Sequence, residues 1–270
     1  MNKNKIREKF FELESYIKKF NTIKHEFSKK TIVSLTTFGP RIPTVHYTIM
    51  SILAQTKIPY KIFLYIYKEK ISDELINLQK QFSKIFFIKK LKVDMKSYSK
   101  LLPALDDEDA KNKNIVTIDD DIIYNKNLIN ALEEYNALYP DCIIGNGCHS
   151  VKEISCKYYK TFLNKNDRGS KSNDIFLMGV GGVLYPPNCF KKRKMNYAEA
   201  KALCPSQDDI YFWLYEKINN LKRIPLKNEL LNLDFSSIIK HNKKLFTTNR
   251  KGGNDAALEN IFSAYTIYKS

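Results

Sequence analysis

Short β-rich runs alternate with helical patterns between residues 31 and 145, and this alternation restricts the fold more than any other feature of the chain. The runs are apolar and rich in β-branched and aromatic residues, as buried strands are. Strands are predicted at 31–38, 61–67, 84–91, 114–118 and 142–145, and helices at 44–55, 72–82, 98–107 and 127–139. Because strands alternating with helices of this length form βαβ units, we expect an open, mostly parallel twisted sheet with helices on both faces.

The second half of the chain is less regular. Its clearest predicted elements are a glycine-bearing strand at 179–185, a helix at 207–220 and a strand at 222–226. No internal repeat and no linker-like segment interrupts the sequence. Residues 31–270 are therefore predicted to form one α/β domain with a less regular C-terminal half, with the two halves at 31–150 and 151–270.

Residues 1–30 precede this domain as a basic segment with a helical pattern. The segment carries nine Lys and Arg against four Glu. Its apolar residues recur at helical spacing: Phe10, Phe11, Leu13, Ile17 and Phe20. Such a helix either contacts a membrane surface peripherally or packs on the domain, and the pattern allows both.

Charge and targeting signals restrict the partners and the compartment. The chain has 45 Lys and Arg against 29 Asp and Glu, so its formal net charge is +16. A surface of that kind attracts nucleic acid, anionic lipid or phosphorylated small molecules. The N-terminus has no apolar signal core, no stretch approaches the roughly 20 apolar residues of a membrane span, and no cysteine pair has C-x-x-C spacing. We expect a cytoplasmic protein with reduced thiols and at most a peripheral contact with the inner membrane.

Three consecutive carboxylates, Asp119, Asp120 and Asp121, follow the predicted strand 114–118. In open α/β sheets, ligands bind outside the carboxyl ends of the strands. Adjacent carboxylates repel one another and stay ionised most easily beside a cation. In an extended chain Asp119 and Asp121 point the same way, so we expect them to hold Mg²⁺ or Mn²⁺ with substrate phosphates, while Asp120 turns aside. The alternative is a solvated acidic turn before the next helix.

Two other acidic groups have weaker signals. Residues 106–109 lie in a polar stretch and are expected to form a solvated loop. Asp208 and Asp209 open the predicted helix 207–220, where carboxylates are favourable for capping alone. The functional alternative is a general base that takes a proton from an acceptor hydroxyl.

Basic and histidine side chains add three candidates. Arg41 and Lys100 lie near predicted loops and are suited to contacts with diphosphate oxygens. His241 lies in a late segment that could fold back over the metal, so we carry it as a third candidate ligand.

Five motifs spread over roughly residues 31–226 match one known pattern. They are Ile32-Val-Ser-Leu-Thr-Thr-Phe followed by Arg41, Ser51-Ile-Leu-Ala-Gln-Thr, Ile118-Asp-Asp-Asp-Ile-Ile-Tyr124, Gly181-Gly182 before an apolar strand, and Gln207-Asp208-Asp209. In that order they resemble a first strand with its nucleotide-binding turn, an S-[IL]-x-x-Q-T helix end, a D-x-D metal motif, an acceptor-side strand and the acidic opening of a catalytic helix. Together they resemble bacterial GT-A fold glycosyltransferases, close to the family 2-like group of capsule and lipooligosaccharide gene clusters.

This resemblance implies a GT-A-like fold in which 31–150 binds the nucleotide-sugar donor and 151–270 carries the acceptor side and the base. The implied donor-binding residues are Thr36, Thr37, Phe38, Arg41, Asp94, Lys100, Asp119 and Asp120, and the implied metal ligands include Asp121 and Asp119. The implied reaction moves a sugar, most often from a UDP-sugar, to a saccharide or lipid-linked saccharide. Mn²⁺ or Mg²⁺ neutralises the leaving diphosphate, and Asp209 or Asp208 removes the acceptor proton, which gives inversion. The usual acidic pair is Glu-Asp, so the Asp-Asp pair here leaves the base open between the two, with Asp209 preferred by alignment.

Three other functions compete with this one. A nucleotidyltransferase that makes sugar nucleotides normally has a glycine-rich, basic loop after its first strand, whereas residues 36–41 contain one Gly and one Arg. A nucleic-acid-binding protein would leave the strand-end carboxylates unexplained, because they repel phosphates in the absence of metal. An inactive carbohydrate-binding relative also fits, since a fold does not determine a function. We predict a glycosyltransferase with no nucleic-acid partner.

Overall fold

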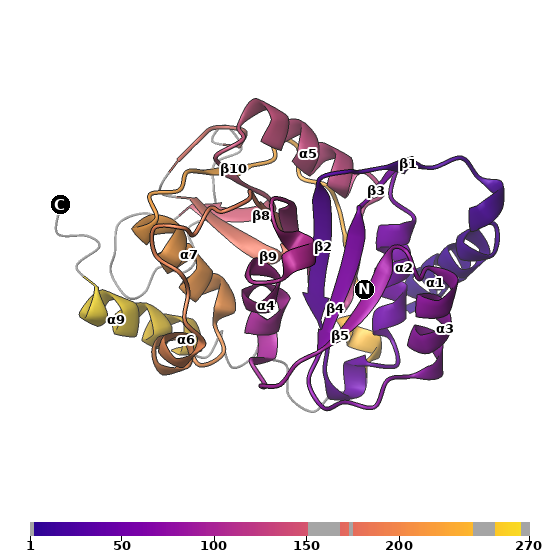
Figure 1. The fold of residues 1–270 in the computed structure, drawn as a ribbon, viewed down its shortest axis with the longest axis horizontal. Helices are drawn as coiled ribbons and strands as arrows, with labels where there is room; N and C mark the ends of the chain where they lie inside the picture. The colour runs from indigo at the N-terminus through magenta and orange to yellow at the C-terminus, as the bar shows by residue number, and fades with distance from the viewer. Residues whose placement is uncertain (1–2, 151–167, 173–174, 240–251, 266–270) are drawn as a thin grey trace.

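The computed structural model describes residues 3–150, 168–172, 175–239 and 252–265. Its centre is a seven-stranded sheet with the order β10–β8–β9–β6–β2–β4–β5 (Figure 1). The strands are β2 (Thr31–Thr36), β4 (Lys61–Ile66), β5 (Phe86–Lys90), β6 (Asn114–Thr117), β8 (Ile143–Ser150), β9 (Ile175–Tyr185) and β10 (Arg223–Pro225). β2, β4, β5 and β6 are parallel, β9 is antiparallel to both neighbours, and β8 is parallel to β10. The predicted mostly parallel α/β sheet is confirmed.

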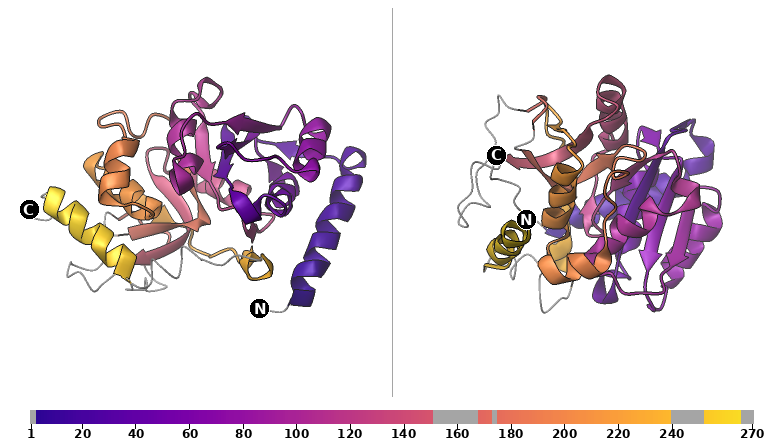
Figure 2. Two further views of the ribbon diagram at one scale, coloured as in Figure 1. Left: turned by 90° about the horizontal axis from the view of Figure 1, so that it is seen from below. Right: turned by 60° about the vertical axis from the view of Figure 1, so that its left-hand side comes forward.

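Helices cover both faces of this sheet, because its strands are apolar on both sides. In β2, Ile32 packs into one hydrophobic core and Val33 into the other, and both are fully buried. The first core includes α2 (Val45–Leu53), α3 (Asp73–Gln81) and α5 (Leu128–Leu138), and the second includes α4 (Leu102–Leu105), α6 (Tyr197–Leu203), α7 (Asp208–Ile218) and α9 (Asn254–Ala264). Figure 2 places α9 at the opposite end of the molecule from α1 (Lys3–Lys18).

Several elements differ from their predicted form. The helix expected at 98–107 is a 3-10 helix, Lys96–Lys100, followed by the short α4, because Pro103 is tolerated only in the first turn of a helix. β8 and β9 are longer than predicted, since polar and glycine residues of each strand pair with the other. Beyond the acidic turn, β7 (Ile122–Ile123) pairs antiparallel with β11 (Leu233–Asp234).

The N-terminal segment uses its apolar face inside the fold. Ile6, Phe10 and Leu13 of α1 are buried, and the ring of Phe10 is stacked on Tyr47 with centroids 3.5 Å apart. The alternative of a helix packed on the domain therefore describes this face. Within α1, Phe11, at 72% exposure, is the one large apolar side chain left exposed. No helix in the described parts of the chain has the length and apolarity needed to cross a membrane.

We expect Gly181→Ala to lower the free energy of unfolding by about 1–3 kcal/mol, because it overpacks a strand pair. A Cβ at Gly181 would lie 2.3 Å from the backbone N of Gly147 on β8, and backbone atoms cannot rotate away. Gly147→Ala is the matched control, since its Cβ would come closest to the flexible end of Met178, at 3.2 Å, and would meet backbone only at ordinary contact distance, 3.5 Å from the Cα of Gly181. Urea denaturation compares the two variants, and an equal or smaller loss for Gly181→Ala would contradict this packing.

Candidate functional site

The acidic triplet occupies a turn just beyond the carboxyl end of β6, where an α/β sheet binds its ligands. The chain turns at Asp120 and Asp121 instead of remaining extended. The predicted alternation therefore does not hold: Asp120 and Asp121 share Arg41, whereas Asp119 contacts Lys100. The fold brings both cations, predicted as donor contacts, onto the triplet.

Arg41 forms ion pairs with two carboxylates of the turn. Its Nη1 lies 2.5 Å from Asp120 Oδ1, and its Nη2 lies 3.0 Å from Asp121 Oδ2. Thr37 Oγ1 also donates to Asp120, at 2.6 Å. Burial alone would lower the pKa of Arg41, but the charges of Asp120 and Asp121 outweigh that effect and raise the pKa. The guanidinium stays charged and gives the turn a cation from the protein itself.

One guanidinium does not neutralise this turn. Burial raises the pKa of Asp120 and raises that of Asp121 to about 7, and Arg41 opposes these shifts only in part. Within the described residues, no three His, Cys, Asp or Glu side chains are grouped to enclose a metal ion. Mg²⁺ and Mn²⁺ are often held by one or two carboxylates together with substrate phosphates, and a turn of three carboxylates that Arg41 and Lys100 neutralise only in part fits that mode. His241 lies outside the described residues, so its role stays a prediction.

Lys100 joins the acidic turn to the start of α7. Its Nζ lies 2.9 Å from Asp119 Oδ1, 2.8 Å from Asp208 Oδ2 and 3.7 Å from Asp209 Oδ1. The residue is only 5% exposed. Burial alone would lower the pKa of Lys100, but the three carboxylates raise it well above its usual value. A single buried ammonium thus gathers two acidic groups that lie far apart in the sequence.

Asp208 and Asp209 open α7, as predicted, and Asp209 is also held by β9. The Gly179 N–H donates to Asp209 Oδ2 at 3.1 Å. A Cβ at Gly179 would lie 2.6 Å from Asp209 Oδ1 and 2.7 Å from Lys100 Nζ, so glycine leaves room for both side chains. The side chain of Asp209 is 28% exposed, against 13% for Asp208. Burial raises the pKa of Asp209 to about 7, a value suited to a general base.

The other predicted donor residues have different neighbours. Phe38 is 42% exposed, and the guanidinium carbon of Arg41 lies 5.9 Å from its ring centre. Thr36 Oγ1 donates to a backbone carbonyl of β4 at 2.8 Å. Asp94 accepts a hydrogen bond from the Lys96 N–H at 2.9 Å. The structure therefore brings Phe38 next to Arg41, whereas these contacts of Thr36 and Asp94 involve no residue of the acidic turn.

The acidic run at 106–109 is only partly the solvated loop that was predicted. Asp107 accepts hydrogen bonds from Lys89 Nζ at 2.5 Å and from the Tyr65 hydroxyl at 3.0 Å. Asp109 accepts from Lys61 Nζ at 2.8 Å. Asp107 and Asp109 therefore attach the run to β4 and β5, while Asp106 and Glu108 are exposed.

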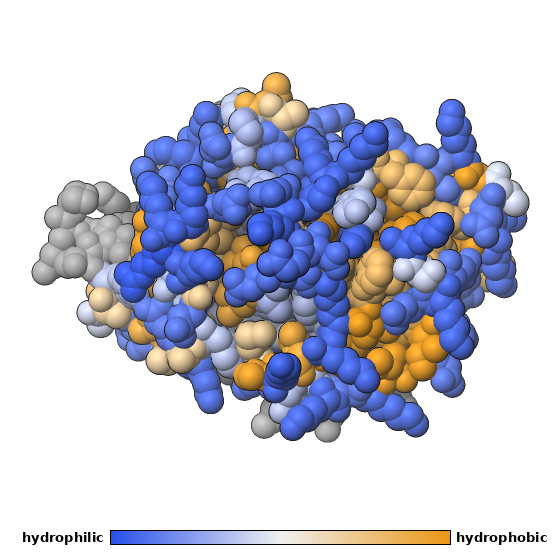
Figure 3. All heavy atoms as spheres, in the orientation of Figure 1, coloured by the Kyte–Doolittle hydropathy of each residue, from blue (hydrophilic) through white to orange (hydrophobic). Residues whose placement is uncertain are grey.

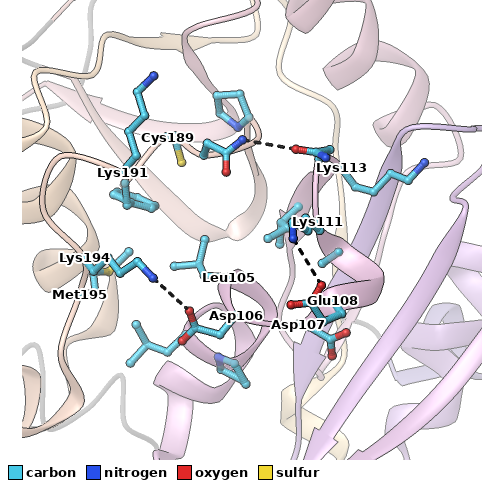
Figure 4. A pocket seen from close by; sticks show the side chains of 18 of the residues that line it. Leu105, Asp106, Asp107, Glu108, Lys111, Lys113, Cys189, Lys191, Lys194 and Met195 are labelled. Carbon is cyan, nitrogen blue, oxygen red and sulfur yellow. Dashed lines mark hydrogen bonds and ion pairs between the residues drawn. The ribbon is translucent and has the colours of Figure 1, made fainter.

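A cavity of about 500 Å³ lies between α4 and the loop that follows β9 (Figure 4). Lys113 and Ile115 line it at the amino end of β6, whereas Asp119 lies beyond the carboxyl end of that strand. Lys194 and Asp106 approach each other across it at 3.9 Å. None of the described candidate site residues lines this cavity, so the chemistry is not assigned to it.

Sequence reasoning missed two residues that hold the site together, Gly179 and Tyr124. A glycine inside a strand often marks a close approach, and that signal was available for Gly179. Tyr124 ended the D-x-D motif without a role, yet its hydroxyl lies between the Asp119 N–H and the carbonyl of Val180. No local pattern indicates that contact, because Val180 is 56 residues away.

Comparisons with known proteins identify the fold. No protein-family model matches the sequence, and a search of curated proteins gives no match. Staphylococcus aureus TarS 1–349 superposes with a TM-score of 0.50 at 12% identity, covering 88% of this chain and 72% of that one. Its complex with UDP-GlcNAc gives a TM-score of 0.50 at 12% identity, covering 88% of this chain and 73% of that one. Another TarS structure gives a TM-score of 0.51 at 12% identity, covering 88% of this chain and 44% of that one.

A provisionally named glucose-1-phosphate thymidylyltransferase from Bacillus anthracis gives a TM-score of 0.48 at 14% identity, over 84% of this chain and 95% of that one. That score is too low to carry an argument. At the identities found for TarS, the likeness shows the fold alone. The fold of this chain is GT-A-like, as the motifs predicted.

Proposed function

We propose that this protein is a metal-dependent glycosyltransferase that moves a sugar from a UDP-sugar to a saccharide or lipid-linked saccharide with inversion. One observation carries the proposal: Lys100 holds Asp119 of the strand-end turn together with Asp208 and Asp209 of α7. A diphosphate-binding group and a base must be neighbours for such a transfer. The UDP-GlcNAc complex of TarS, which shares the fold, supports a UDP-sugar as donor.

Each residue of the turn receives a role on the donor side. Asp119 and Asp121 would hold Mn²⁺ or Mg²⁺, which supplies Lewis-acid neutralisation of the leaving diphosphate when it is bound. Arg41 lies beside Asp121 and presents a guanidinium, the group best suited to paired phosphate oxygens. Thr37 and Arg41 orient Asp120, so that this carboxylate stays within the turn.

On the acceptor side, Asp209 is the proposed general base. Its greater exposure makes it accessible to a hydroxyl, and its 3.7 Å separation from Lys100 leaves it less neutralised than Asp208, at 2.8 Å. The carboxylate takes the hydroxyl proton as the oxygen attacks the anomeric carbon, opposite the departing diphosphate. Asp208, closer to Lys100, orients that ammonium between the two acidic groups.

The cellular setting extends the proposal. The motif resemblance supports surface polysaccharide biosynthesis of the capsule or lipooligosaccharide type, on the cytoplasmic side of the inner membrane. The net charge of +16 suits donors and acceptors that carry phosphate. A peripheral membrane contact would use the exposed basic face of α1, since its apolar face is packed in the fold.

The direct test measures two products. The purified protein is incubated with Mn²⁺ and either UDP-glucose, UDP-galactose or UDP-GlcNAc, and release of UDP is followed, with water accepting the sugar in place of a saccharide. In parallel, UTP or dTTP is supplied with glucose 1-phosphate, and release of pyrophosphate is followed. UDP release supports the transferase, whereas pyrophosphate release without UDP release would establish the nucleotidyltransferase instead.

A further inference from the structure

The motif that ends α2 holds the segment following the acidic turn. Ser51 Oγ accepts from the Tyr124 N–H at 3.1 Å, and Gln55 Nε2 donates to the Asn125 carbonyl at 2.8 Å. Gln55 Oε1 accepts from the Ile129 N–H at 3.1 Å. Both side chains belong to residues only 2% exposed. This helix end therefore acts on the backbone beyond the turn rather than on a ligand in solvent.

Tyr124, whose backbone is held by Ser51, also contacts the acidic turn through its side chain. Its hydroxyl accepts from the Asp119 N–H at 2.8 Å and donates to the Val180 carbonyl at 3.2 Å. The residue is 4% exposed, and a phenol hydroxyl both donates and accepts, so one oxygen serves both hydrogen bonds. One hydroxyl thus connects the first residue of the triplet to β9.

The β9 end of this connection lies beside the proposed base. Val180 follows Gly179, whose N–H holds Asp209. We propose that Tyr124 is a positioning residue that sets the separation between the donor-binding turn at Asp119 and the proposed base Asp209. This inference rests on the proposed function, because it assigns the spacing between two halves of that same site.

The rate of sugar transfer depends on the spacing between the donor and the base far more than the affinity for UDP does. A misplacement of about 1 Å at a reacting centre costs on the order of 10²-fold in rate. Without the phenol oxygen, the Asp119 N–H loses its partner and the turn is free to move relative to β9. UDP and the metal are assigned to the turn and to Arg41 beside it, so donor affinity depends less on where β9 lies.

The test is Tyr124→Phe, which keeps the ring and removes both hydrogen bonds. We expect kcat for UDP release, with the best of the three UDP-sugars, to fall at least about tenfold. The dissociation constant for UDP with Mn²⁺ stays within about threefold of the wild-type value. A residue that only packs would lower thermal stability and leave kcat per folded molecule unchanged.

Tyr215→Phe is the matched control, because Tyr215 is also buried, at 1% exposure, and donates its hydroxyl to Glu199 away from the turn. We expect Tyr215→Phe to lose stability without losing kcat. Ser51→Ala, which removes the acceptor of the Tyr124 N–H, should lower kcat in the same direction as Tyr124→Phe. Wild-type kcat in Tyr124→Phe, or equal losses of kcat in Tyr124→Phe and Tyr215→Phe, would overturn the inference.

Failure of the proposed function gives a different pattern. Wild-type protein that neither binds UDP with Mn²⁺ nor releases UDP would overturn the function and this role of Tyr124 together. Active wild-type protein with an equally active Tyr124→Phe would overturn only the positioning role.

Discussion

Asp209→Asn is expected to lower the rate of UDP release from a UDP-sugar by at least about 10²-fold, the usual size of a general-base effect. The amide keeps the shape of the carboxylate, and its oxygen is still able to accept the Gly179 N–H, but it takes up no proton. Affinity for UDP with Mn²⁺ should stay near the wild-type value, because Asp209 lies on the acceptor side. Steady-state kinetics and calorimetry measure the two quantities on the same preparation.

Asp208→Asn is the control for that prediction, since the two carboxylates are adjacent and share Lys100. We expect it to cost less turnover than Asp209→Asn. An inactive Asp208→Asn beside a fully active Asp209→Asn would transfer the role of the base to Asp208. Two fully active variants would remove the general base from α7 altogether.

The second large effect is expected from Lys100→Met, which should lower the free energy of unfolding by about 3–5 kcal/mol at pH 7. Methionine fills the space of the buried stem but leaves Asp119, Asp208 and Asp209 facing one another without their shared cation. Repulsion among these carboxylates also separates the donor turn from α7, so UDP release should be lost. Urea denaturation gives the stability, and the UDP assay gives the activity.

Lys89→Met provides the comparison on the same sheet. Lys89 also pairs with two carboxylates, Asp107 and Asp109, which are 14% and 49% exposed, but its own side chain is 24% exposed, against 6% for Lys100. Solvent screens such pairs, so we expect a loss of about 1 kcal/mol or less and no loss of UDP release. Equal destabilisation by both substitutions would contradict the special position of Lys100.

Local patterns were sufficient for most of the sheet and its helices. The apolar, β-rich run at 31–38 predicted a buried strand, and β2 lies between the two hydrophobic cores. The helix predicted at 72–82 is α3, which Ser72 caps by accepting from the Leu75 N–H. The place of β9 between β6 and β8 had no such signal. Strand order depends on long-range packing, which short-range periodicity does not encode.

The site residues were likewise predictable from local sequence, whereas the contacts between them were not. The Asp triplet and the Asp208–Asp209 pair were found because each stands at the end of a predicted element. Their compensation by protein cations was not foreseen, because Arg41 lies 79 residues before Asp120. A metal was expected at the triplet because adjacent carboxylates stay ionised most easily beside a cation, and Arg41 and Lys100 supply part of that positive charge.

The most direct measurement is calorimetric titration of the protein with UDP, in Mn²⁺ and then in EDTA, for wild type and for Asp121→Ala. We predict that wild-type protein binds UDP in Mn²⁺, that EDTA abolishes binding, and that Asp121→Ala binds under neither condition. Arg41→Lys, which keeps a positive charge beside Asp121, should retain weaker metal-dependent binding. Binding of equal strength in Mn²⁺ and EDTA, undiminished in Asp121→Ala, would contradict a metal and donor site at the end of β6.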